Sequence, residues 1–408
     1  MLFKQETLPN GLTLIGEINA AAKSAAVGFF VRTGSRDETM EVSGVSHFLE
    51  HMLFKGTERL SAFEVNEAFD SRGAQFNAAT SEEYTVYYAG VLPEYLVEIT
   101  ALWAELMRPA LRDDDFNMEK NVIKEEIAMY QDTPSADVME RCRALHFGMH
   151  PCGQSVLGSV KSIDALTAGQ MRDYFARRYA PNNVIAACAG RFDWERFVEA
   201  VASSCGAWET QTADRILTHE PGTMKRERLA KSNLKREHIC LMHSGISRQD
   251  PRRFAASLLA VIAGDEYGSR FYWELVDKAL AEAASMHFGG MDGTGVFYSY
   301  LRCSVANANR VMDVVAGVFD ELAREGVAVD ELAKAKNKVL SARVVRNELP
   351  MGRLGDLGSN WMYLRACRPI AEDVAAIKAV TTDDVNALIG QLDLRRFTQY
   401  SLGPDATT

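Results

Sequence analysis

The residues best suited to chemistry lie in one short motif, His47-x-x-Glu50-His51. Two histidines four positions apart, with a glutamate directly before the second, share one side of an α-helix. Imidazole nitrogens are common ligands of catalytic zinc, and a neighbouring glutamate can move the proton of a water molecule. The motif therefore predicts half of a zinc hydrolase site, with His47 and His51 as metal ligands and Glu50 as the catalytic base. The alternative is a hydrogen-bonded helix face that carries two ordinary histidines.

A helix over 45–55 must position these side chains. Beside the polar stripe runs an apolar stripe, formed by Val45, Phe48, Leu49, Met52 and Leu53. An apolar stripe docks a helix on a core, so the polar stripe can direct two imidazoles and a carboxylate at one point. Catalytic zinc usually takes three protein ligands, and a third must therefore come from elsewhere in the chain.

A second helical segment, 115–130, offers that third ligand. Glu119 and Glu126 fall on its largely apolar face, which also carries Val122, Ile123 and Ile127. An unpaired carboxylate is costly to bury, whereas Glu125 points away from this face and is expected to be solvated. A metal would explain a buried Glu126, and Glu119, two turns earlier, could support a histidine from behind. The alternative is an ion pair with a nearby lysine or arginine.

With these motifs the chain resembles the pitrilysin/insulinase family of inverted-motif zinc peptidases, in particular bacterial peptidases similar to mitochondrial processing peptidase. The resemblance rests on 45–57 followed by Glu119-x₆-Glu126. Further matching stretches are Leu8–Leu12, Gln75–Ser81, His150–Gly153 and Asn182–Val184. The family's second glutamate is its third zinc ligand, which implies Glu126 here, one Zn²⁺ per chain and Glu119 in a supporting position.

The resemblance implies an α+β fold of two homologous α/β halves that enclose a cavity. Each half would be a mixed, largely antiparallel sheet covered by helices. It also implies a zinc-dependent endopeptidase that cleaves extended, unfolded or presequence-like peptides, as a homodimer or as a heterodimer with a related subunit. The alternatives are a non-catalytic assembly subunit of the same fold and the metal-bearing half of a heterodimeric peptidase. The intact set of four residues argues against the assembly subunit.

Substrate contacts are predicted at two places. Phe76, Asn77 and Ala78 lie on a strand that could pair with an extended peptide, with Asn77 at the substrate main chain. The family's second half also supplies an arginine and a tyrosine, and the arginine is matched by Arg270. The tyrosine position falls at Ala283, so another tyrosine or a partner subunit would have to serve. Arg270 could equally be an ordinary surface arginine.

The chain divides into two related halves. Strands are expected at Leu12–Glu17, Ala25–Arg32, Gln75–Thr80, Tyr84–Gly90 and Val184–Ala189. Helices are expected at 45–55, 62–71, 94–107, 115–130, 135–147, 168–178 and 193–204. A charged stretch over 209–237 indicates a linker, so we expect a catalytic domain at 1–215 and a degenerate one at 225–408. In the second half, Ala255, Leu258, Leu259 and Ala342 occupy the positions of His47, Glu50, His51 and Glu126.

Composition excludes several classes of protein. With 408 residues, 47% of them hydrophobic and 25% charged, the chain is expected to form two or more globular domains. A net charge of −10 argues against a nucleic-acid partner. There is no apolar run long enough for a membrane span, and the first residues lack the pattern of a signal peptide or presequence, so a cytoplasmic location is expected. Seven scattered cysteines fit a reducing compartment.

Overall fold

The computed structural model describes residues 2–219 and 221–405. These form two compact units whose boundaries do not follow the chain in order. Unit 1 takes its described residues from Met1–Ile127, Gln154–Ile216 and Val344–Arg368. Unit 2 takes its described residues from Ala128–Gly153, Leu217–Arg343 and Pro369–Thr408. Each unit therefore contains a helical segment from the other half of the chain, and the linear division near 215–225 stays a prediction.

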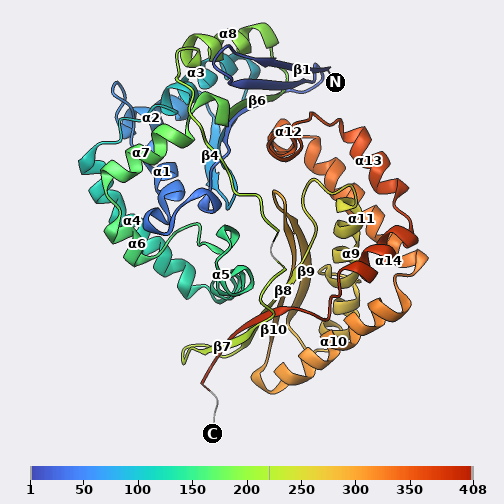
Figure 1. The fold of residues 1–408 in the computed structure, drawn as a ribbon. Coiled ribbons are helices and arrows are strands. Elements are labelled where there is room, and N and C mark those ends of the chain that lie inside the picture. Colours follow the sequence, from blue (N-terminus) through green and yellow to red (C-terminus); the bar gives the residue numbers. More distant parts are fainter. Residues whose placement is uncertain (1, 220, 406–408) are drawn as a thin grey trace. The chain divides into compact units, whose positions relative to one another are not determined.

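Unit 1 is built on a six-stranded sheet in the order β1-β2-β6-β3-β5-β4 (Figure 1). The strands are β1 (Leu2–Thr7), β2 (Thr13–Ile18), β6 (Val184–Gly190), β3 (Ala25–Val31), β5 (Thr85–Val91) and β4 (Gln75–Thr80). Only the β2–β6 pair is parallel, so the sheet is mixed and largely antiparallel as predicted. Strand β4 lies at an edge, with no partner strand on its other side among the described residues.

Helices cover both faces of this sheet because its central strands are apolar on both sides. Phe29 of β3 belongs to a core shared with α1 (Val45–Leu53), α3 (Leu96–Leu106), α4 (Asp113–Asp132), α7 (Ala168–Arg178) and α8 (Trp194–Cys205). Its neighbour Phe30 faces the opposite core, which contains Leu354 and Leu357 of α12 (Pro350–Leu364). Gly358 permits this approach, because a Cβ there would lie 2.1 Å from the Phe30 ring. Unit 1 also contains the shorter helices α2 (Ala62–Asp70) and α6 (Val160–Ala165).

Unit 2 repeats this plan with a five-stranded sheet in the order β7-β11-β8-β10-β9. The strands are β7 (Arg226–Ala230), β11 (Thr398–Gly403), β8 (Glu237–Ser244), β10 (Gly295–Cys303) and β9 (Ala283–Gly290). One face packs against α9 (Arg253–Gly264), α10 (Ala308–Glu325), α11 (Val329–Asn347), α13 (Ile370–Ala379) and α14 (Thr382–Gln391). The other face packs against α5 (Pro134–Phe147). Strand β7, which follows Lys225, lies at an edge of this sheet and is largely exposed.

The predicted internal repeat is confirmed, with an exchange that sequence patterns did not show. In each unit a strand leads to a helix, a hairpin and two further helices, and the next helix joins the other unit (α5 in unit 2, α12 in unit 1). Helix α9 matches α1, and its Ala255, Leu258 and Leu259 are buried in an apolar core. The predicted strands and helices of the first half all occur, with ends shifted by no more than two residues. No helix in the described ranges is both long and apolar enough to cross a membrane.

Two buried histidines in unit 2 bear on its stability. His146 of α5 pairs through Nδ1 with the Thr398 hydroxyl at 3.1 Å, and His243 of β8 packs against the rings of Phe319 and Phe397. Burial lowers the pKa of His146 to about 4 and that of His243 to about 3. Both rings are therefore neutral at pH 7.

We expect the free energy of unfolding to decrease as pH falls from 6.5 towards 4. The unfolded chain binds protons at the ordinary histidine pKa of 6.5, whereas folded His146 binds one only near pH 4. The stabilisation from the neutral ring is thus complete above pH 6.5 and is lost on acidification, and for His146 it amounts to about 3 kcal/mol. Urea unfolding at several pH values measures this slope. His146→Gln should flatten the slope and the exposed control His287→Gln should not; equal slopes in all three proteins would contradict the assignment.

Candidate metal centre

Helix α1 is docked as its apolar stripe predicts. Val45, Phe48, Leu49, Met52 and Leu53 are all at most 1% exposed and belong to the core of unit 1. The helix starts after Gly44, whose φ of +94° favours glycine. A Cβ on Gly44 would also lie 2.6 Å from the Leu157 carbonyl oxygen. The polar stripe of α1 is consequently directed towards α4 and β4.

The structure brings the three predicted metal ligands together. The Glu126 Oε2 atom lies 3.6 Å from His47 Nε2 and 3.4 Å from His51 Nε2. One ligand atom from each residue falls within 4.8 Å of the other two, and this is the single such group among the described residues. Zinc bonds of about 2.0–2.1 Å in a tetrahedron place neighbouring donors about 3.3 Å apart. The donor set and its spacing therefore fit a zinc ion with a fourth position left open.

The charges around the three ligands favour a bound cation. Burial lowers the pKa of His47 to about 4, which keeps its ring neutral and able to coordinate. Burial also acts to lower the pKa of His51, but hydrogen bonds with Glu119 and Glu126 outweigh it and raise that pKa to about 9. The hydrogen bond with His51 lowers the pKa of Glu126. The site thus stabilises a positive charge between its carboxylates, and a divalent cation would take the place of the proton.

Glu119 occupies the supporting position predicted for it. Its Oε1 lies 2.8 Å from His51 Nδ1, and its Oε2 lies 2.5 Å from the Lys55 ammonium. Only 3% of the Glu119 side chain is exposed. A hydrogen bond of this kind fixes the tautomer and the ring orientation of a metal-binding histidine. Lys55, one turn after His51, was missed by sequence reasoning, although the alternative of an ion pair with a lysine pointed to such a residue.

The buried face of α4 is narrower than predicted. Phe116, Glu119, Ile123 and Ile127 are buried, and Glu125 is exposed as expected. The placement of Val122 on the buried face was wrong, because this side chain is 46% exposed. The buried residues of α4 follow one another at intervals of three or four. Val122 precedes the buried Ile123 by one residue, and its side chain is therefore turned away from that of Ile123 around the helix.

Glu50, the predicted base, is held by a residue of the edge strand. The Thr80 hydroxyl donates a hydrogen bond of 2.6 Å to Glu50 Oε2. Burial raises the pKa of Glu50, and this hydrogen bond offsets part of the rise. A raised pKa suits a general base, because such a group works best when its pKa is near the working pH. Thr80 was also missed; its signal was its place at the end of the strand that begins at Gln75.

Strand β4 presents its main chain more than its side chains. Phe76 stacks on Phe69, with ring centroids 4.1 Å apart, and Ala78 is buried. Asn77 is exposed, and its Oδ1 accepts a 2.9 Å hydrogen bond from the Ala78 N–H group. The Ala78 N–H group is thereby occupied by a local side chain, which a substrate strand could displace. The substrate roles of Phe76, Asn77 and Ala78 stay predictions.

Arg270 has carboxylate partners within unit 2. Its Nε and Nη2 atoms lie 2.8 and 2.9 Å from the two carboxylate oxygens of Glu331, and Nη2 donates to the Gly326 carbonyl at 2.8 Å. The Arg270 side chain is only 14% exposed, so it is not the ordinary surface arginine of the alternative, and its substrate role stays a prediction. Ala283, at the position where a tyrosine was expected, is the first residue of β9.

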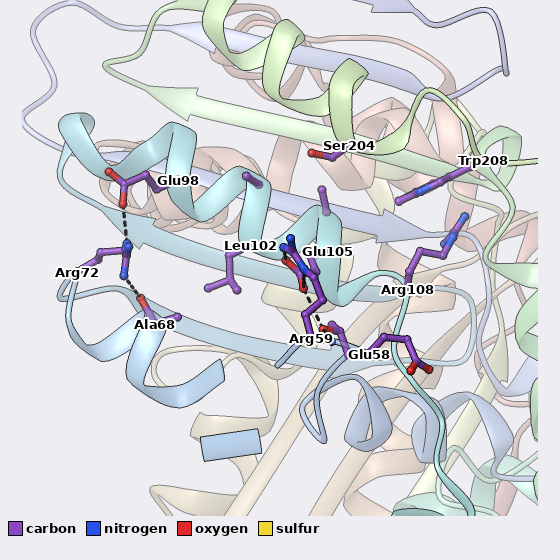
Figure 2. A pocket seen from close by; sticks show the side chains of 13 residues that line it. Glu58, Arg59, Ala68, Arg72, Glu98, Leu102, Glu105, Arg108, Ser204 and Trp208 are labelled. Atoms are coloured by element: carbon purple, nitrogen blue, oxygen red, sulfur yellow. Dashed lines mark hydrogen bonds and ion pairs between the residues drawn. The ribbon is translucent and has the colours of Figure 1, made fainter. Parts of the chain in front are cut away.

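A separate cavity of about 520 Å³ in unit 1 is lined neither by the three predicted metal ligands nor by Glu50 or Glu119 (Figure 2). Its arginines are already engaged. Arg59 pairs with Glu105 and Arg72 pairs with Glu98. Arg108 stacks on the Trp208 ring at 3.6 Å and donates to the main-chain carbonyl groups of Met107 and Tyr179. Each arginine that lines this cavity therefore already has a partner within the protein, and the cavity gives no sign of a bound anion.

Comparisons with known proteins point to one family. Residues 14–160 match the family model described as insulinase (peptidase family M16), and residues 165–339 match the one described as peptidase M16 inactive domain. A Streptomyces coelicolor protein named as an uncharacterized zinc protease is 30% identical over 98% of this chain and 89% of its own length. An Arabidopsis thaliana protein, named as a probable mitochondrial-processing peptidase subunit beta, is 27% identical over 93% of this chain and 74% of its own length. The crystal structure of a protease from Helicobacter pylori shares the fold, with a TM-score of 0.91 and 21% identity over 99% of this chain and 100% of that one.

Proposed function

The chain belongs to the insulinase family of peptidases (peptidase family M16), and on that premise we propose that it is a zinc-dependent endopeptidase of unfolded peptides. The observation that carries the proposal is the meeting of His47, His51 and Glu126 beside Glu50. A non-catalytic assembly subunit would need none of these four residues, and their arrangement favours the peptidase.

The chemistry divides between the ion and the side chains. Zinc, held by His47, His51 and Glu126, would supply a water molecule of lowered pKa and polarise the scissile carbonyl group. Glu50 takes the proton of the attacking water and delivers it to the leaving amine nitrogen. The Thr80 hydrogen bond orients the Glu50 carboxylate for this transfer.

The substrate class follows from the free edge of β4. An extended peptide can add to this edge as a further strand, so that its main chain supplies binding energy without a fixed sequence. An unfolded or presequence-like segment can adopt this extended conformation, whereas most of the main chain of a folded domain is already hydrogen-bonded within that domain. In this arrangement the main chain of Phe76 and Ala78 contacts the peptide, and Asn77 exchanges its local hydrogen bond for one to the substrate. The family resemblance alone supports Arg270 as a further substrate contact.

The direct test is metal removal. A purified preparation should contain about one zinc ion per chain and cleave members of an unstructured peptide library. Treatment with a chelator should stop cleavage, because the three ligands alone supply no polarising charge, and added Zn²⁺ should restore it. Mass spectrometry of the products measures both effects. Cleavage that persists in the metal-free protein would contradict the proposal.

The same assay addresses the partner. We propose that the protein acts as a homodimer or with a related subunit, since Ala283 leaves the tyrosine position empty and the Arabidopsis relative is named as a subunit. Activity of the chain alone supports the homodimer. Zinc binding without cleavage, followed by cleavage when a related chain is added, supports the heterodimer.

A further inference from the structure

The start of the metal-binding helix depends on a carboxylate from outside it. Helix α1 has nine residues, and its N-cap residue, Gly44, has no side chain to accept a hydrogen bond. The first N–H groups of a helix have no partner within it. Here the carboxylate of Glu38 accepts hydrogen bonds from two of these N–H groups. Oε2 accepts from the Gly44 N–H group at 2.7 Å, and Oε1 accepts from the Ser46 N–H group at 2.7 Å. A negative charge at this end also interacts favourably with the helix dipole.

Ser46, the residue directly before His47, is held by its side chain as well. Its hydroxyl lies 2.9 Å from the Tyr174 hydroxyl, which in turn lies 2.7 Å from the Thr33 hydroxyl. Tyr174 is on α7, and Thr33 follows β3. Ser46 is therefore fixed through its main chain by Glu38 and through its side chain by α7.

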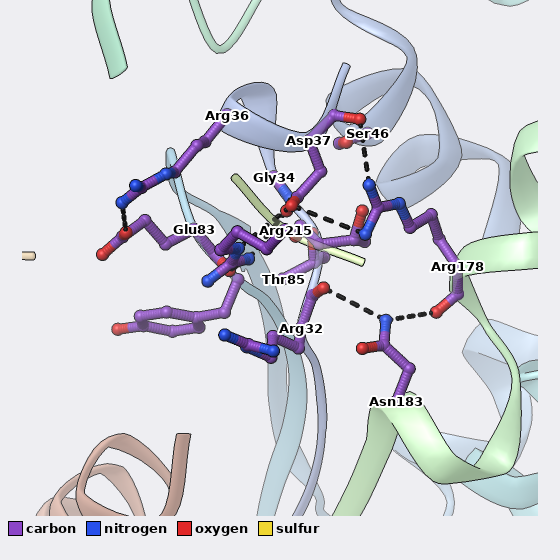
Figure 3. Close-up of polar contacts among 12 residues, drawn as sticks. Arg32, Gly34, Arg36, Asp37, Ser46, Glu83, Thr85, Arg178, Asn183 and Arg215 are labelled. Carbon is purple, nitrogen blue, oxygen red and sulfur yellow. Dashed lines mark hydrogen bonds and ion pairs between the residues drawn. The ribbon is translucent and has the colours of Figure 1, made fainter. Parts of the chain in front are cut away.

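The segment that carries Glu38 is itself anchored. The Asp37 side chain is fully buried and accepts hydrogen bonds of 3.0 and 2.7 Å from Arg215, while Arg178 lies 3.5 Å away (Figure 3). Arg178 is the last residue of α7, the helix that carries Tyr174. These paired charges leave the main chain at Glu38 little freedom to shift relative to α7.

Burial of the Glu38 carboxylate is energetically unfavourable. The residue is 5% exposed, and the hydrogen-bond partners of its carboxylate among residues 2–219 and 221–405 are main-chain N–H groups, without a lysine or arginine. Burial raises its pKa to about 7, against the effect of the N–H groups that it accepts from. A carboxylate kept in such a place is explained by what it holds, which is the first turn of α1.

We infer that Glu38 is a positioning residue of the metal centre: its carboxylate fixes the first turn of α1 and so sets the place of His47. This inference rests on the proposed zinc site. Metal ligands must be held within about 0.5 Å of their working geometry, and a helix that frays at its first turn releases its third residue, which here is His47.

The test is Glu38→Gln, which keeps the shape but offers one acceptor oxygen and turns an NH₂ group towards the other N–H. The matched control is Glu41→Gln, three residues away at an exposed position. We expect zinc affinity, measured by competition with a chromogenic chelator, to fall about 10–100-fold in Glu38→Gln, as for other residues that orient metal ligands. The visible absorption of the Co²⁺-substituted protein should change, and kcat should fall while KM does not. The control should match the parent protein.

A purely structural Glu38 would give a different pattern. A lower melting temperature with unchanged zinc affinity and an unchanged cobalt spectrum would overturn the inference. If Glu38→Gln does not fold, Tyr174→Phe removes only the hydroxyl that holds Ser46 and should shift the same readouts by a smaller factor; unchanged readouts would again overturn it. Failure of the parent protein to bind zinc would instead refute the proposed function, so the two results are distinguishable.

Discussion

The Glu50→Gln variant is expected to lose cleavage of unstructured peptides by about 10²–10⁴-fold and to keep its zinc. Glutamine preserves the size of the side chain and can still accept the Thr80 hydrogen bond, but it cannot take a proton from water. The three proposed metal ligands should stay in place, because the carboxylate of Glu50 is held by the hydroxyl of Thr80 on β4. The loss should fall on kcat, since substrate binding at the β4 edge does not use this carboxylate.

The measurement combines peptide kinetics with zinc content on the same preparation. Glu67→Gln, an exposed glutamate on α2, is the control for the amide substitution itself and should cleave as the parent does. Cleavage by Glu50→Gln at the parental rate would remove Glu50 from the mechanism. Loss of zinc together with activity would instead show that Glu50 is needed for zinc binding.

Residues of the site could be predicted where a polar or charged side chain falls on an apolar face of a predicted helix. Glu126 stood out because a carboxylate on an apolar helix face is costly, and the structure places it against two imidazoles. The histidines stood out by their spacing. Both patterns lie within short segments of the chain. They predict the structure well because the spacing of residues along a helix determines which side of the helix each side chain faces.

The supporting residues left no such signal. Lys55 lies just after α1, Thr80 is the last residue of β4 and Glu38 lies before α1, and no hydrophobic period marks any of the three. Their roles depend on which loops and edges approach α1, and periodicity does not encode that. Sequence patterns therefore predicted the three side chains that the structure brings together, but not the neighbouring groups that contact them.

The same limit explains the fold. Strands and helices of the first half follow from their apolar periods, and their ends were correct to within two residues. The exchange of α5 and α12 was not visible, because an apolar stripe states that a helix is buried and not which core buries it. Each of these helices begins with a proline, Pro134 or Pro350, directly after a long helix. The chain passes from one unit to the other within the last turns of the preceding helix, between Ile127 and Ala128 in α4 and between Arg343 and Val344 in α11.

The Glu126→Gln variant is expected to lose zinc as well as activity, and its neighbour provides the control. Glutamine is a weak, uncharged donor, so the centre would lose one ligand and the negative charge that favours a cation between His47 and His51. The fall in zinc affinity should exceed the roughly 10–100-fold typical for the loss of a supporting residue.

Glu125→Gln makes the identical chemical change one position along α4, on an exposed side chain that faces away from the histidines. It should bind zinc and cleave peptides as the parent does. The two variants lie on the same helix and make the same change in charge and side-chain size. A difference in zinc affinity between them can therefore be assigned to the position of the Glu126 carboxylate beside the imidazoles. Equal zinc affinity in Glu126→Gln and the parent would mean that the third ligand is another residue, and the mechanism would lose its geometric basis.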